Sequence, residues 1–332
     1  MVVIHSYAWA IFLAFITMLC WGSWANTQKL ATKKWPFQLF YWDYAVGVLL
    51  LSLLLAFTAG STGTEGRSFS ADLSQADFSA LGSAFLGGVV FNIANLLLVA
   101  AIAIAGMAVA FPIGIGLALA LGVIVNYIAT PLGNPLILFI GVAFVIAAIV
   151  LDAMAYRKLP GQTESPTKGI VVSLLAGLLM GFFYRFVAAS MVTDFVNPEA
   201  GRLTPYTASV VFAVGLLVSN FLWNSIFMYK PLAGERVTYR DYIKSGDTRL
   251  HLIGILGGAI WSFGFTVNII AAEQAGFAIS YGLGQGATMV AALWGVFIWK
   301  EFKGAKGVNG LLTAMFLFFA IGLALIIAAR LY

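Results

Sequence analysis

The sequence predicts an all-α integral membrane protein with ten transmembrane helices, arranged as two inverted five-helix repeats. Three observations support this fold class. The 332 residues are 61% hydrophobic and only 9% charged, whereas a soluble domain carries about 25% charged residues. The apolar residues fall into ten runs, each close to the roughly 20 residues that span a bilayer. Finally, a segment of the first half resembles a segment of the second half.

Five of the apolar runs lie in the first half of the chain. Glycines and a proline interrupt some of them, which transmembrane helices tolerate because neighbouring groups satisfy the freed backbone. In chain order, the predicted spans are 9–28, 38–60, 79–101, 106–128 and 135–155.

The other five runs lie in the second half, and the longest connection in this half is 229–249. Five Lys or Arg residues in that connection predict a polar surface hairpin or a short amphipathic segment. The predicted spans are 168–190, 205–228, 250–272, 278–299 and 306–330.

The basic residues are distributed unevenly between alternate loops. Cytoplasmic loops are enriched in Lys and Arg, so the basic set of loops is expected in the cytoplasm, with both termini on the other side of an inner or plasma membrane. The net charge of +5 reflects this bias, and nucleic acid is not an expected partner. The other side has only Arg67, Arg202 and Arg330. The basic set is Lys29, Lys33, Lys34, Arg157, Lys158, Lys168, Lys230, Arg236, Arg240, Lys244, Arg249, Lys300, Lys303 and Lys306.

An ungapped internal repeat relates residues 86–116 to residues 256–286. Both segments begin Leu-Gly-Gly and share further Ala and Gly positions. The spacing makes spans three and four equivalent to spans eight and nine, so each repeat has five helices. An odd number of helices inverts the second repeat, as in alternating-access carriers. The chain is therefore divided into 1–160 and 161–332, which form one membrane domain.

Small residues and a proline occupy equivalent places in spans four and nine. They predict either tight helix packing or a hinge, because Gly permits close approach and Pro disrupts the backbone ladder. These residues are Pro112, Gly114, Gly116, Gly284 and Gly286.

Polar and aromatic residues inside the spans predict a central cavity. Polar groups in the membrane usually face the bundle interior, and amides offer donors and acceptors to a polar solute. The alternative is that single Asn side chains tie helices together by hydrogen bonds. The predicted lining is Asn92, Asn95, Trp261, Tyr281 and Gln285, with Trp24, Asn26, Asn220 and Asn224 as further candidates.

Three charged residues inside or next to the spans are candidates for proton coupling. Arg185 lies well inside a span and needs a partner, a water-filled path or a position from which it snorkels to the interface. Glu273 and Asp43 are candidate proton carriers, and each can alternatively be an interfacial charge.

Catalytic and metal-binding signatures are absent from the sequence. There is no HExxH, G-x-S-x-G or P-loop motif, and the only cysteine is Cys20. We expect no enzyme activity, no metal and no cofactor. A channel would need a ring of like charges or a filter signature, and the sequence has neither.

Several local motifs resemble the drug/metabolite transporter superfamily. The resemblance is to its branch of rhamnose–proton symporters, glucose/ribose uptake proteins and plant ureide permeases, and at the level of ten helices it covers the whole chain. The motifs are Trp21-Gly22-Ser23-Trp24, Lys33-Lys34-Trp35-Pro36, Trp42-Asp43-Tyr44 and Phe111-Pro112-Ile113-Gly114-Ile115-Gly116.

This resemblance implies import of a small neutral solute by proton symport with alternating access. A monosaccharide is the first expectation, and a ureide, nucleobase or nucleoside is the second. Export of a drug or metabolite comes third, and a membrane sensor without transport is the alternative from another class. The resemblance also implies that spans five and ten lie outside the transport core, where they would form a homodimer contact.

Overall fold

Ten helical segments of the described chain are long and apolar enough to cross a membrane. The computed structural model describes residues 1–31, 35–159 and 167–332. The ten spans confirm the predicted ones to within a few residues. In the first half they are formed by α1 (Tyr7–Ser23) with α2 (Ala25–Ala31), α3 (Phe37–Phe57), α5 (Phe78–Ala105), α6 (Met107–Ala110) with η1 (Phe111–Ile115) and α7 (Gly116–Ala129), and α8 (Pro135–Tyr156).

The second half has five spans in the same order, and its fourth span is again interrupted. These spans are α9 (Thr167–Ser190), α10 (Pro205–Tyr229), α12 (Thr248–Ala275), α13 (Phe277–Gly284) with α14 (Ala287–Leu293) and η2 (Trp294–Ile298), and α15 (Asn309–Ala328).

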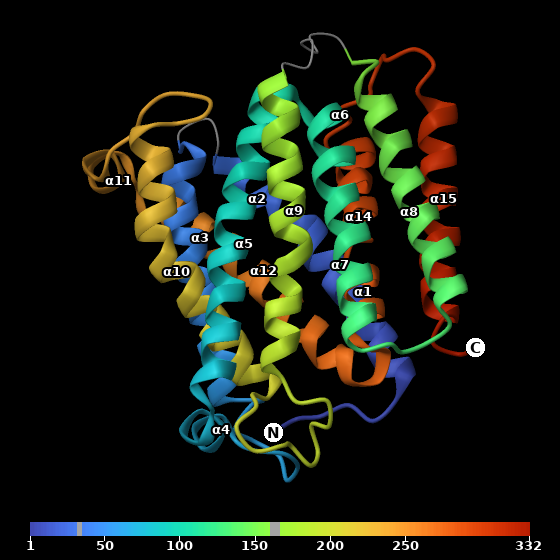
Figure 1. Cartoon of the computed structure of the whole chain (residues 1–332). Helices are drawn as coiled ribbons and strands as arrows, with labels where there is room; N and C mark the ends of the chain where they lie inside the picture. Colours follow the sequence, from blue (N-terminus) through green and yellow to red (C-terminus); the bar gives the residue numbers. More distant parts are fainter. Residues whose placement is uncertain (32–34, 160–166) are drawn as a thin grey trace.

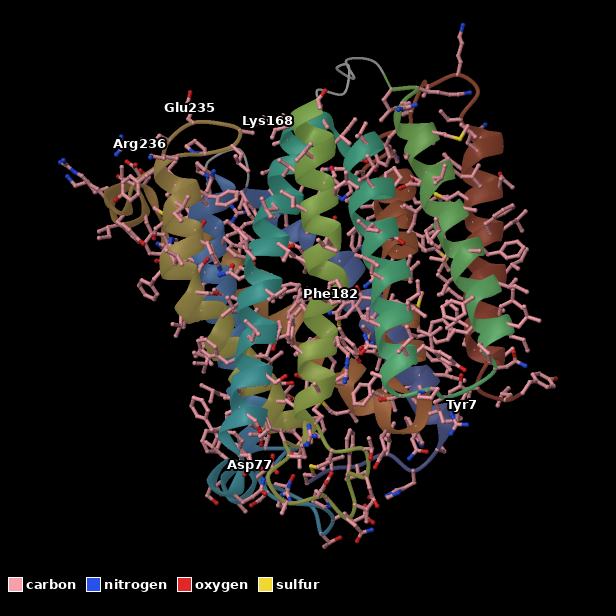
Figure 2. The ribbon with its side chains drawn as sticks, viewed as in Figure 1. Tyr7, Asp77, Lys168, Phe182, Glu235 and Arg236 are labelled. Carbon is pink, nitrogen blue, oxygen red and sulfur yellow. The ribbon has the colours of Figure 1, made fainter. Side chains whose placement is uncertain are left out.

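Two short helices mark opposite ends of the bundle. Helix α4 (Phe69–Gln75) precedes α5, and α11 (Tyr239–Ser245) precedes α12 within the predicted surface segment 229–249. Figure 1 shows α11 at one end of the bundle, and α4 with both chain termini at the other. We call these the α11 end and the α4 end. Lys168 and Arg236 lie at the α11 end, and Asp77 lies at the α4 end (Figure 2).

The boundaries of two long helices repeat along the chain at the spacing that the internal similarity predicts. Helix α5 runs from Phe78 to Ala105, and α12 runs from Thr248 to Ala275, so both boundaries are shifted by 170 positions. Gly106 and Gly276, which follow these two helices, both have positive φ angles, of 76° and 85°. Because α5 starts at the α4 end and α12 starts at the α11 end (Figure 1), these helices run in opposite directions. This arrangement supports the inverted repeat, while the predicted division at 160/161 lies outside the described residues.

The spans that surround the centre differ in their packing from those at one edge. Helix α5 packs against α9 and α10, and α12 packs against α1 and α3. Helices α8 and α15 pack mainly against each other and form one edge of the bundle (Figure 1). They expose apolar side chains such as Leu136 and Leu317, which suits lipid contact. The homodimer contact expected through these two spans stays a prediction.

Candidate functional site

A cavity of about 200 Å³ lies between the two halves of the chain. Its lining runs along α1 and α2 from Trp21 to Gln28, and along α5 from Phe91 to Ile102. Because α1 and α5 both run toward the α11 end (Figure 1), the cavity extends from the middle of the bundle toward that end.

Aromatic rings form the walls of the cavity. Trp261 of α12 stacks on Trp21 of α1, with ring centroids 5.8 Å apart and planes 10° apart. The Phe91 ring lies 4.4 Å from the Trp261 ring, and the Nε1 atom of Trp21 donates to the carbonyl oxygen of Trp261 at 3.3 Å. Trp24, Phe111 and Phe183 complete the aromatic lining. These faces can stack on a flat solute, and such aromatic contacts contribute about 0.5–1.5 kcal/mol beyond the area they bury.

Glycines of α12 bring the neighbouring helices close enough to form these walls. A Cβ at Gly264 would lie 2.7 Å from the Cβ of Cys20 on α1, and one at Gly258 would overlap the carbonyl oxygen of Tyr44 on α3. Such small residues allow helix backbones to approach closely in a membrane. The close approach places the Trp261 ring between α1 and α5.

The polar lining is small and, among the described residues, carries no formal charge. Asn95 donates through Nδ2 to the hydroxyl oxygen of Tyr41 at 3.3 Å, which leaves its Oδ1 atom for a solute. Gln285 and Thr288 line the cavity from the fourth span of the second half, and Gln28 lines it from α2. Amide groups can both donate and accept hydrogen bonds, so the cavity suits a neutral solute with N–H and C=O groups.

Interruptions of the fourth span in each half border the cavity. Residues Phe111–Ile115 form a π-helical turn, because Pro112 lacks an N–H and its ring clashes with the preceding turn. In the second half, α13 ends at Gly284 and α14 begins at Ala287, which leaves Gln285 on the cavity wall between two helices. The two interruptions are equivalent in the repeat. Discontinuous helices at such positions are typical of carrier binding sites.

The glycines predicted at these interruptions have different surroundings. A Cβ at Gly284 would lie 2.8 Å from the Trp21 ring, and one at Gly286 would lie 2.7 Å from the Met18 methyl group. A Cβ at Gly114 would lie 2.9 Å from Leu98, whereas one at Gly116 would meet no atom within 4 Å. Gly284 and Gly286 therefore serve close packing against α1. A hinge at any of the four stays a prediction.

Of the predicted lining residues, the structure brings Asn95, Trp261, Gln285 and Trp24 to the cavity. Asn92 instead donates to Leu216 O at 3.1 Å and to Ser219 Oγ at 2.8 Å on α10. Asn92 and Asn95 are about 60° apart around a helix with 3.6 residues per turn, which is enough for Asn92 to bond to α10 while Asn95 lines the cavity.

The other predicted lining residues also lie away from the cavity and connect helices. The Tyr281 hydroxyl donates to Ala118 O and Met180 O, and Asn224 Nδ2 donates to Gln38 O at 2.8 Å. Asn26 Oδ1 accepts from Trp299 Nε1 at 2.6 Å. Asn220 is fully buried, and neither of its amide atoms has a partner in the described part of the chain.

The three charged candidates lie outside the cavity lining. Glu273 accepts a hydrogen bond from the Phe195 backbone N–H. Arg185 is half-buried on α9, and no acidic side chain of the described residues forms an ion pair with it. Asp43 is different, because it is 3% exposed and belongs to a cluster with Tyr242 and His251.

Sequence reasoning missed several residues that form the cavity and the cluster around Asp43. Phe91 was identifiable in principle, because the repeat makes it equivalent to Trp261, and Trp21 belongs to the Trp21–Trp24 motif. No sequence motif singles out Phe183 or Thr288 as a lining residue. Tyr242 and His251 are separated from Asp43 by 199 and 208 positions, so only the fold brings them together.

Comparisons with known proteins show similarity to transporters. The sequence profile described as ureide permease matches residues 40–163 and 156–329. Ureide permease 4 of Arabidopsis thaliana is 23% identical over 99% of each chain. The glucose uptake protein GlcU of Bacillus subtilis is 24% identical over 60% of this chain and 58% of its own. A solved crystal structure has a TM-score of 0.60 at 14% identity over 97% of each chain, which shows the fold alone.

Proposed function

The chain belongs to the ureide permease family, and on this premise we propose that it carries a small neutral ureide through the central cavity by alternating access. The family is one of transporters, so the chain is a multi-pass membrane protein that moves small polar solutes and is not an enzyme. The observation that carries the proposal is the uncharged cavity with aromatic walls and side-chain amides.

A ureide matches this lining better than a monosaccharide does. A cyclic ureide is flat and presents amide N–H and C=O groups, which pair with the amides of Asn95 and Gln285 while its faces stack on Trp21 and Trp261. A monosaccharide presents hydroxyl groups around its whole ring. Each hydroxyl buried without a partner would cost about 1–3 kcal/mol, and the lining has few polar side chains. Sugar transport is the second candidate, because relatives include sugar uptake proteins.

Alternating access is supported by the position of the cavity and by the interrupted spans. The cavity reaches from the middle of the bundle toward the α11 end, while the aromatic rings of Tyr184, Phe277 and Tyr281 pack together on the side of the α4 end. The interruptions at Phe111–Ile115 and Gln285 lie beside the cavity, where a change in helix angle would open one side and close the other.

We further propose that the α11 end faces the cytoplasm and that both termini face outward. The basic loops support this orientation, because Lys168 and Arg236 lie at the α11 end (Figure 2). In a Cys20→Ser background, we expect Val3→Cys and Leu331→Cys to react with a membrane-impermeant maleimide in intact cells, and Lys244→Cys to react only after permeabilisation. Protection of both terminal cysteines in intact cells would reverse the orientation.

Asn95 and Asn92 offer a matched pair that tests the site. We expect Asn95→Leu to weaken ureide affinity by about two- to tenfold, since loss of one hydrogen bond costs about 0.5–1.5 kcal/mol. Asn92→Leu should lower yield or melting temperature but leave the affinity of the folded protein unchanged, because Asn92 bonds only to α10 among the described residues. Affinity is measured as KM for labelled allantoin uptake into proteoliposomes. Unchanged KM for Asn95→Leu, with altered KM for Asn92→Leu, would place the site elsewhere.

A further inference from the structure

A groove of about 170 Å³ lies on the outer side of the bundle, between α8 and the π-helical turn of the first half. Val150 and Met154 are 41% and 45% exposed, so this side of α8 faces the lipid. The α8 positions that line the groove follow a spacing of three, four and seven residues, which places them in one stripe along the helix. The described lining is Pro112 of the π-helical turn and Val150, Ala153, Met154 and Arg157 of α8 and its C-cap.

The groove changes from apolar to charged along its length. Val150 and Met154 lie within the span, whereas Arg157 caps α8 at the α11 end (Figure 1). At 1.5 Å per residue, the stripe from Val150 to Arg157 is about 10 Å long. No carboxylate of the described residues forms an ion pair with Arg157. The groove therefore has the same order of groups as a phospholipid, whose acyl chains lie in the bilayer core and whose headgroup lies at its surface.

Basic side chains surround the charged end of the groove. Lys158, next to Arg157, donates through Nζ to Gly307 O at 2.8 Å, so the loop between η2 and α15 lies beside the end of α8. The basic residues of that loop are Lys300, Lys303 and Lys306. Its carboxylate, Glu301, already forms an ion pair with Lys29 of α2. The surplus of positive charge favours an anionic headgroup, as in basic pockets between helices at the cytoplasmic membrane surface.

The equivalent position in the second half is covered by the protein itself. The repeat places Gly282 where the first half has Pro112. A Cβ at Gly282 would lie 3.7 Å from Cδ1 and 3.8 Å from Cγ2 of Ile326 on α15, which is ordinary packing distance. Helix α15 thus packs on this position, whereas α8 leaves a groove beside Pro112. Side chains that border an empty space lose packing contacts, so lipid is expected to fill this groove in a membrane.

The π-helical turn separates the groove from the central cavity. Phe111 and Ile115 of this turn line the cavity, while Pro112 lines the groove. The same turn is the interruption of the fourth span, where proline weakens the backbone ladder. An acyl chain against Pro112 would therefore support one wall of the cavity from its outer side.

We propose that this groove binds one anionic phospholipid of the cytoplasmic leaflet. The lipid phosphate accepts two hydrogen bonds from the Arg157 guanidinium, which is the geometry typical of Arg–phosphate pairs. One acyl chain lies along Val150 and Met154 and reaches Pro112. The bound lipid replaces the missing contacts between α8 and the π-helical turn, and so holds the turn in the shape that forms the cavity wall.

Lipid retention by the purified full chain tests the site without transport. The protein in detergent is mixed with equal amounts of phosphatidylglycerol and phosphatidylcholine, and bound lipid is identified by native mass spectrometry. We expect the wild type to retain one phosphatidylglycerol in preference to phosphatidylcholine. Arg157→Gln should weaken this retention by about tenfold or more, because a charge-assisted pair is lost.

Arg236→Gln is the matched control for Arg157→Gln. Arg236 is an exposed cation at the α11 end, where it lies over the Tyr229 ring and far from α8 (Figure 2). We expect this variant to retain phosphatidylglycerol as the wild type does. Equal retention of both lipids by the wild type, or unchanged retention by Arg157→Gln, would overturn the proposal.

An indole placed in the apolar part of the groove distinguishes a lipid from a second copy of the chain. We expect Val150→Trp to lose phosphatidylglycerol, whereas Ile140→Trp, at a 43% exposed position of α8 outside the groove, should keep it. Size-exclusion chromatography of both variants reports their oligomeric state. If Val150→Trp dissociated a dimer but still retained phosphatidylglycerol, the groove would be a subunit contact and the proposal would be wrong.

Proteoliposomes test the supporting role of the lipid, and this part of the inference rests on the proposed function. The KM for labelled allantoin is measured in phosphatidylcholine vesicles with and without phosphatidylglycerol. Allantoin is neutral, so the surface charge of the vesicles does not change its local concentration. We expect phosphatidylglycerol to lower the KM of the wild type by about fivefold, the lower end of typical coupling between two sites, and to leave the KM of Arg157→Gln unchanged.

The outcomes separate the lipid site from the proposed function. A wild-type KM that does not depend on phosphatidylglycerol would overturn the supporting role of the lipid. Absence of allantoin uptake in both kinds of vesicle would overturn the proposed function, while the retention measurements on Arg157→Gln and Arg236→Gln would still decide whether the groove binds an anionic phospholipid.

Discussion

Replacing Gly258 by valine is expected to prevent recovery of folded carrier. A Cβ at Gly258 would overlap Tyr44 O and lie 2.8 Å from Val48 N on α3. These are backbone atoms of a neighbouring helix, so neither can rotate away, and α12 must separate from α3. Overpacking typically costs about 1–3 kcal/mol and sometimes more. The added methyl groups increase the overlap, so we expect loss of the monodisperse peak in size-exclusion chromatography.

The equivalent glycine of the first half should behave in the same way. A Cβ at Gly88 would overlap Phe212 O and lie 2.7 Å from Leu216 N on α10. Gly82 of α5 is the matched control, since a Cβ there would meet no atom within 4 Å. We expect Gly82→Val to give normal yield. Normal yield and melting temperature for Gly258→Val would show that the α3–α12 contact is not as close as described.

Filling the cavity with Ala291→Trp is expected to abolish uptake without unfolding the protein. Ala291 lines the cavity on α14, and the added indole would occupy space that a solute needs. Because the side chain enters an existing cavity of about 200 Å³, its burial does not require helices to separate. We expect transport of labelled allantoin into proteoliposomes to fall to the level of empty vesicles, with a melting temperature close to that of the wild type.

Ala143→Trp provides the control for Ala291→Trp. Ala143 is exposed on α8, at the edge of the bundle formed with α15, so an indole there would contact lipid. We expect this variant to transport allantoin at the wild-type rate. If Ala291→Trp transported normally while remaining folded, the solute path would not pass through this cavity.

The sequence was sufficient for the fold but only partly sufficient for the site. Apolar runs define the spans because lipid requires about 20 apolar residues in each, and the Leu-Gly-Gly similarity relates α5 to α12. Neither pattern shows the direction in which a buried amide side chain points. Asn92 and Asn95 lie one turn apart on the same helix, yet Asn92 bonds to α10 and Asn95 bonds to Tyr41 of α3. The packing of α5 against α3 and α10 determines which of the two amides lines the cavity.

The cluster around Asp43 shows the same limit for charged residues. Asp43 stands out in the sequence because it is a carboxylate inside an apolar span, but an interfacial position explains that equally well. Its partner Tyr242 lies within the surface segment 229–249, and its partner His251 lies at the start of another span; polar residues are ordinary in both places. Their convergence depends on the contact between α3 and α12, which Gly254 and Gly258 permit.

A competition experiment tests most directly whether the cavity carries a neutral ureide. Uptake of labelled allantoin into wild-type proteoliposomes is measured in the presence of unlabelled allantoin, glucose or allantoate. Allantoate has a carboxylate, for which the described residues of the lining offer no cationic partner. We expect unlabelled allantoin to inhibit uptake, and we expect glucose and allantoate to inhibit it at least about tenfold more weakly. Equal or stronger inhibition by glucose or allantoate would contradict the ureide assignment.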